Sequence, residues 1–307
     1  FIVFIIVLAA ILWVFQDNFL KLLVPQKGTA LSISAATELK EIAYLEKIDN
    51  FLLKEYSKEQ VLLHTIQADT FYSYKNSPVQ ILNVEVKTFN DTKEEGLVLS
   101  SNRAEILKSG EMFFNGEVNI QSKKGISHEL DTESLIVLTD SGLIKSNKEV
   151  TYLGETARII SESMEMNIES DTMYLNGNVK ILEDSGVTIN TKNLYISHNA
   201  GEKKYKSKEA TVYHSKNNII NSDKGIDIDM NFKLMKLLGE VEVLTRAGAV
   251  INSYNVEIDQ SNDNEVLKSN SPSHFKSDTV DIRAKKMHYD AVTNKLELMN
   301  KVLAVYE

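Results

Sequence analysis

From about residue 48 onward, apolar and polar residues alternate along the chain with a period of two. Ile226, Ile228 and Met230 show this rhythm. Successive side chains of a β-strand point to opposite faces, so the alternation predicts half-buried strands and an all-β body. Helix-period spacing is found mainly over residues 37–54. That stretch is compatible with a helix or with a strand beginning at Ile48, and the period alone leaves both open.

Three sequence features recur together at intervals of about 61 residues. The first is a run of nine residues whose matching valines are spaced by 61, 62 and 61: MFFNGEVNI at 112–120, MYLNGNVKI at 173–181, MKLLGEVEV at 235–243 and LELMNKVLA at 296–304. The second is a Lys-Ser motif: IKSNKEVTY from Ile144, YKSKEATVY from Tyr205 and LKSNSPSHF from Leu267. The third is a turn glycine before each new unit: Gly125, Gly186 and Gly248. Repetition in phase predicts stacked structural units that bury a continuous apolar interior.

The parity of each nine-residue run assigns its apolar residues to one face. The residues expected on this interior face are Met112, Phe114, Val118, Ile120, Met173, Leu175, Val179, Ile181, Met235, Leu237, Val241, Val243, Leu298 and Val302. A glycine stands at the centre of the first three runs and Asn300 at the centre of the fourth. A mid-strand glycine indicates a bulge or bend. We therefore predict an elongated, open β-jellyroll or curved pair of antiparallel sheets.

The interior of such a fold admits two interpretations. One is a dry core, which composition alone favours. The other is an apolar groove that holds alkyl chains, for which the recurring methionines would provide adaptable contacts.

The first residues have a different character. Residues 1–15 carry no polar side chain. In a second apolar stretch, Phe19 to Val24, the one polar residue is Lys21. A signal peptide requires a cleavage site soon after the apolar run, but the nearest small-residue cluster lies some twenty residues later. A buried core helix would lack a helical partner. We expect a single transmembrane anchor at residues 1–24, followed by a linker at 25–46.

Composition and motifs argue against several functions. The net charge is -9 without a basic block, so no nucleic-acid partner is expected. The absence of cysteine excludes disulfides, thiolate metal sites and thiol catalysis. Asp227, Asp229 and Asn231 imitate the start of a calcium loop, but Phe232 and Leu238 replace its glycine and glutamate. The six histidines form no ligand pair, and nucleotide-binding and nucleophile motifs are absent. We predict a protein that is not an enzyme and has no cofactor.

Residues 48–184 resemble LptC, the membrane-anchored periplasmic component of the bacterial lipopolysaccharide export machine. The resemblance lies in three segments, in this order: FLLKEYSKEQVLLHTIQADTFYSYKNSPVQILNVEVKTFN, LVLSSNRAEILKSGEMFFNGEVNI and IKSNKEVTYLGETARIISESMEMNIESDTMYLNGNVKI. These β motifs are shared with the soluble bridge protein LptA and the wider OstA-like superfamily. The combination of anchor, order and spacing is what points to LptC.

The resemblance implies a function and a set of partners. Residues 47–184 would form the LptC-like jellyroll, and 185–307 would add further OstA- or LptA-like repeats. The interior residues would line a groove for the acyl chains of lipopolysaccharide. Residues 1–24 would pack on the membrane subunits of the inner-membrane ABC exporter, with the body in the periplasm of a Gram-negative bacterium.

The final strand is expected to be an exposed edge. Its residues Val302, Leu303, Ala304, Val305 and Tyr306 would pair with an LptA-like or outer-membrane translocon jellyroll. The alternatives are a purely structural tether with a dry core and, less favoured, a sugar-binding β-solenoid.

Overall fold

The computed structural model describes residues 44–57, 60–89, 95–122, 129–138, 141–154, 156–167, 170, 172–197, 203–261 and 265–306. Its regular elements are all β-strands, which confirms the all-β prediction. Within these ranges no helix is long and apolar enough to cross a membrane. The predicted anchor, most of the linker and Gly125 lie outside the described residues.

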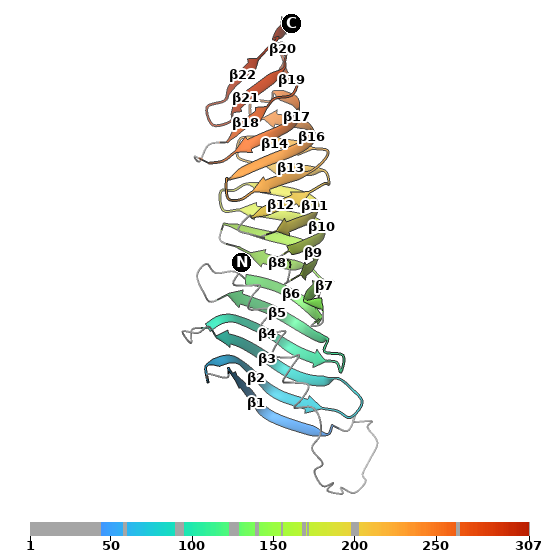
Figure 1. The fold of residues 1–307 in the computed structure, drawn as a ribbon. Coiled ribbons are helices and arrows are strands. Elements are labelled where there is room, and N and C mark those ends of the chain that lie inside the picture. Colours follow the sequence, from blue (N-terminus) through green and yellow to red (C-terminus); the bar gives the residue numbers. More distant parts are fainter. Residues whose placement is uncertain are drawn as a thin grey trace. The chain divides into compact units, whose positions relative to one another are not determined.

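The described residues up to 150, together with residue 167, belong to the first of two compact units, here unit 1. Successive strands of this unit pair antiparallel, each with the next along the chain, and Figure 1 shows them side by side from blue to green. The strands are β1 (Glu46–Tyr56), β2 (Leu62–Ser73), β3 (Val79–Phe89), β4 (Glu95–Ile106), β5 (Met112–Ser122), β6 (Glu129–Leu138) and β7 (Leu143–Ser146). Because β1 is a strand from Glu46, the helical interpretation of 37–54 is wrong over its described part, and the strand interpretation is confirmed.

The described residues within 151–166 and 170–306 belong to unit 2. Strand β8 (Val150–Leu153) begins at the boundary between the two units. The strands that follow it are β9 (Ala157–Asn167), β10 (Thr172–Glu183), β11 (Thr188–Ser197), β12 (Lys204–Ser207), β13 (Thr211–His214), β14 (Asn218–Ser222), β15 (Ile226–Asp229), β16 (Leu234–Thr245), β17 (Val250–Asp259), β18 (Val266–Ser269), β19 (Ser273–Lys276), β20 (Val280–Ala284), β21 (Lys286–Asp290), β22 (Lys295–Met299) and β23 (Leu303–Tyr306).

Long strands of unit 2 take part in two sets of pairings. Residues 195–197 of β11 pair with β12, whereas residues 188–190 pair with β13. In the same way β16 pairs with β15 and β14, and β17 with β18 and β19. Half-sheet A therefore contains β12, β15, β18, β21, β22 and the adjoining halves of the long strands. Half-sheet B contains β13, β14, β19, β20, β23 and the other halves.

The two half-sheets join where the long strands bulge. The register shifts between Leu175 and Asn178 in β10 and between Leu237 and Glu240 in β16, at Gly177 and Gly239. Both glycines have φ near +77 to +79°, a region that favours glycine. The predicted bend at the central glycines is thus confirmed. The turns at the opposite ends of the strands, far from the bulges, are here called the mouth.

The Lys-Ser motif has a structural role at the corners between short strands. Ser146, Ser207 and Ser269 are all buried. At the corner between β12 and β13, the Thr191 hydroxyl donates to Ser207 Oγ at 3.0 Å and shares a 2.8 Å hydrogen bond with Thr211. These hydroxyl groups satisfy one another where water is excluded, so the motif marks a structural corner of each repeat.

Replacing Gly239 by alanine is expected to destabilise unit 2 by about 2 kcal/mol. A Cβ at this position would meet the side chains of Asp223 and Lys224, and φ is +79°. Gly248→Ala is the matched control, because Gly248 has φ +82° but a Cβ added there would meet only open space. Urea unfolding followed by circular dichroism should give a smaller loss for the control. Equal losses would mean that the contact with Asp223 adds nothing to the backbone strain.

Candidate functional site

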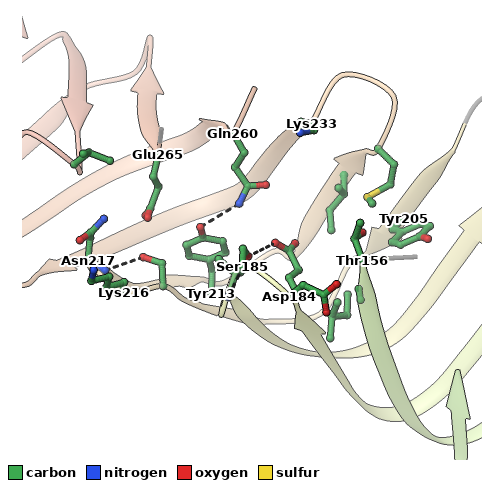
Figure 2. Close-up of a pocket in the computed structure, with 18 residues that line it drawn as sticks. Thr156, Asp184, Ser185, Tyr205, Tyr213, Lys216, Asn217, Lys233, Gln260 and Glu265 are labelled. Carbon is green, nitrogen blue, oxygen red and sulfur yellow. Dashed lines mark hydrogen bonds between the residues drawn. The ribbon is translucent and has the colours of Figure 1, made fainter. Parts of the chain in front are cut away.

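A cavity of about 460 Å³ opens within unit 2, at the mouth between half-sheets A and B (Figure 2). Its apolar and aromatic lining comes from both half-sheets. Half-sheet B contributes Ile181, Val187 and Tyr213, and half-sheet A contributes Tyr205, Ile228 and Met230. The cavity therefore continues the apolar interior outward to the surface.

Turn residues of both half-sheets form a polar rim around this cavity. Lys216 stands on the side of half-sheet B and Lys233 on the side of half-sheet A, with the carboxyl groups of Glu183, Asp184 and Glu265 also in the lining. The rim thus carries both signs of charge above an apolar floor. Such a site suits an amphipathic molecule whose polar part stays in water.

Two tyrosines on the floor of the cavity are uncharged, and burial further favours this form. Burial raises the pKa of Tyr205 to about 12 and also raises the pKa of Tyr213, with the nearby Glu265 carboxylate acting in the same direction. Burial also raises the pKa of Glu183, and the hydrogen bond donated by Ser185 opposes this. Both phenols are therefore protonated at neutral pH, and each presents an apolar ring with one polar tip.

The predicted interior face is buried in the first three repeats. All twelve of the expected residues there have exposed fractions of 3% or less: Met112, Phe114, Val118, Ile120, Met173, Leu175, Val179, Ile181, Met235, Leu237, Val241 and Val243. Ile181 is the member of this set that lines the cavity. Parity found the interior, but whether that interior binds lipid stays a prediction.

The fourth repeat departs from the predicted parity. Asn300 and Lys301 both have positive φ, and the run is broken between β22 and β23. Leu298 is half-buried, and Val302 is 52% exposed. Val302 is therefore not buried, and its place on an interior face stays a prediction. Within the described residues no further strand pairs with β22 or β23 beyond β21 and β20, which agrees with the greater exposure of this run.

The expected C-terminal edge does form a strand. β23 pairs with β20 on one side, and on its other side no described strand pairs with it. Leu303 and Val305 are more than half exposed, and Ala304 is also exposed. The partner of this edge stays a prediction.

Charged residues that had suggested metal chemistry have ordinary structural partners. Asp227 forms an ion pair with Lys206 at 2.9 Å, and the Asp229 carboxylate accepts from the backbone N–H of Asn231. Among the described residues, no group of three metal-ligating side chains comes together.

Sequence reasoning did not find most of the cavity. Its residues come largely from turns and from short strands. These segments contain too few residues to show a regular alternation of apolar and polar positions. Tyr213 was assigned no role from the sequence. Its position in β13, opposite Ile189 and Ile220, places it inside.

In unit 2 the two antiparallel half-sheets have an apolar interior that opens at the mouth, and the described strands form an open β-sheet structure, not a closed barrel. The LptC-related family model for lipopolysaccharide assembly matches residues 2–184 and 211–307. The chain therefore belongs to the LptC-related family. Members of this family are transport proteins rather than enzymes, and membership implies a role in lipopolysaccharide transport in the Gram-negative envelope. No curated protein matches the chain.

Proposed function

We propose that this protein is an inner-membrane-anchored conduit for lipopolysaccharide. It accepts the lipid from the ABC exporter and holds the acyl chains in the interior of the jellyroll. The polar headgroup remains at the mouth, in water. The conduit passes the lipid toward the outer membrane.

The observation that carries this proposal is the cavity between the half-sheets. Each CH₂ group that leaves an apolar environment for water costs about 0.8 kcal/mol, so acyl chains need a continuous apolar path. The cavity joins Ile181, on the repeated interior face, to solvent at the mouth. A lipid is therefore able to enter without complete separation of the half-sheets.

The C-terminal part of the chain is proposed to lengthen the conduit. The second family match, over residues 211–307, includes part of the cavity lining, from Tyr213 to Val292, and continues through the C-terminal strands. One chain would then supply part of the bridge that LptA builds, and β23 would pair with the next jellyroll.

A structural tether is the second candidate. The near-complete burial of the twelve interior residues favours it, because a packed interior leaves no space for acyl chains between the bulges and the mouth.

Site-specific photocrosslinking separates the two candidates. The photoreactive residue is placed at Phe114 in unit 1, at Ile181 and Ile228 in the cavity, and at Leu298. Val212, which faces outward on β13, is the control. In cells with an active exporter, we expect ATP-dependent lipopolysaccharide adducts at the four test positions and none at Val212. Adducts at none of the positions would support the tether. Adducts confined to Phe114, Ile181 and Ile228 would make the last repeat a docking element.

A further inference from the structure

Two hydrogen bonds cross the mouth next to the cavity. Gln260 Nε2, from the end of β17 in half-sheet A, donates to Tyr213 OH in half-sheet B at 3.3 Å (Figure 2). Asn218 Nδ2, at the start of β14 in half-sheet B, donates to Glu265 Oε1, just before β18 in half-sheet A, at 2.8 Å. Both bonds join residues 47 positions apart. In each bond the residue earlier in the sequence belongs to the repeat that starts at Met173 and the later one to the repeat that starts at Met235, so each bond links one repeat to the next.

These four residues lie toward the C-terminal end of the cavity, where Val292 also contributes to the lining. Tyr213, Gln260 and Glu265 all contribute to the cavity lining. Asn218 is 3% exposed and Glu265 8%. Two polar contacts therefore bridge the mouth at the C-terminal end of the cavity.

The preceding repeat differs at the decisive position. Ala157 stands 61 residues before Asn218, in the corresponding place of the repeat, and it lines the open cavity. An alanine side chain has no hydrogen-bonding group, so it cannot make the Asn218–Glu265 contact. The mouth is thus open beside Ala157, whereas the Asn218–Glu265 hydrogen bond crosses it at the equivalent place of the next repeat.

The closing network is polar and only partly satisfied. Asn218 Oδ1 is buried and has no hydrogen-bond partner among the described residues. An unpaired buried oxygen is costly, and separation of the half-sheets would expose it to water. The structure therefore combines bonds that hold the mouth closed with a group that gains hydration when it opens.

We propose that Tyr213, Asn218, Gln260 and Glu265 form a latch that must open before lipid moves from the cavity into the C-terminal repeats. This inference rests on the proposed function and adds a point of control to it. A lipid whose acyl chains lie between the half-sheets has its headgroup outside the mouth. Because the latch spans the mouth, the junction between chains and headgroup cannot pass while both bonds are in place.

Reversible crosslinking of the mouth tests the latch. The chain has no cysteine, so an engineered pair is the sole thiol pair. Asn217→Cys and Val292→Cys place thiols on opposite half-sheets at the rim, and neither side chain belongs to the latch. A bis-methanethiosulfonate reagent with the shortest spacer that reacts would hold the mouth closed, and reductant would release it. The control pair is Asn221→Cys with Glu242→Cys, which are cross-strand neighbours within half-sheet B.

The readout is lipopolysaccharide photocrosslinking at Ile181, before the latch, and at Leu298, beyond it. In the crosslinked full chain we expect adducts at Leu298 to fall at least tenfold, while adducts at Ile181 persist. Reductant should restore the Leu298 adducts, and the control pair should leave both positions unchanged. Undiminished adducts at Leu298 in the crosslinked chain would overturn the latch and leave the conduit standing. If the uncrosslinked chain gave adducts at neither position, the conduit and the latch would both be overturned.

Discussion

Val179→Asp is expected to lower the free energy of unfolding of unit 2 by about 4 kcal/mol. Val179 is 2% exposed, lies on the interior face of β10 just after the bulge, and does not line the cavity. A carboxylate there has neither water nor a described cation to stabilise it. Urea unfolding of the full chain, followed by circular dichroism, measures the loss.

Val212→Asp is the matched control for this substitution. Val212 is also a strand valine of half-sheet B, but it is 38% exposed, and its cross-strand neighbours Asn190 and Asn221 are polar. The loss there should stay within about 0.5 kcal/mol. If Val179→Asp were as mild as this control, water would reach the interior at Val179, and a groove open along its whole depth would replace the packed interior. A folded Val179→Asp protein that still transported lipid would contradict both the groove and the dry core at this position.

The repeat-level features of the fold follow from the sequence because they depend on local backbone chemistry. A glycine at the centre of an apolar strand indicates a bulge or bend, and the register shifts at Gly177 and Gly239 agree with that prediction. The turn glycines Gly186 and Gly248 likewise have positive φ in tight turns. Period-two parity identified twelve interior residues because each long strand has one face against the interior.

Parity fails where a bulge changes its phase. In β11 the buried residues are Ile189, Thr191, Leu194 and Ile196, so the alternation shifts by one residue at Asn193, which has φ +50°. The Asn193 side chain accepts a hydrogen bond from the backbone N–H of Gly177 across the strands. This pairing depends on two segments meeting in space, which the sequence pattern of neither segment reveals.

The cavity and the latch were beyond prediction for a related reason. They arise from contacts between turns 47 residues apart, where single residues such as Asn218 and Glu265 decide the outcome. A repeating pattern reveals what the units share. The proposed latch instead depends on a difference between two repeats, because Ala157 and Asn218 occupy equivalent places and only Asn218 has a hydrogen-bonding side chain.

A different buried group gives unit 1 an expected dependence on pH. His64 on β2 is 5% exposed, and its Nδ1 atom has no hydrogen-bond partner among the described residues. Its cross-strand neighbours are Thr88 on β3 and Glu55 on β1, the latter with a carboxyl group. Burial lowers the pKa of His64 from 6.5 to about 4, so the folded protein holds a neutral imidazole.

The sign of the effect follows from proton binding by the folded and unfolded chains. Above pH 6.5 neither state binds a proton at His64, so its contribution to stability is constant. Between pH 6.5 and about 4 the unfolded chain binds a proton that the folded chain excludes, and the free energy of unfolding therefore falls as the pH falls. The loss reaches up to about 3 kcal/mol and levels off below the folded pKa.

Urea unfolding at pH 7 and pH 4.5 should show this loss in the wild-type chain and a smaller one in His64→Phe, which keeps a ring in the interior without a titrating group. His214→Phe is the control, because His214 is exposed on β13 and its replacement should leave the wild-type dependence intact. Comparison of the three chains removes the contribution of carboxyl groups that titrate in the same range, since all three proteins share them. An unchanged pH dependence in His64→Phe would mean that His64 binds a proton as readily in the folded chain as in the unfolded chain, and that water or Glu55 reaches its ring.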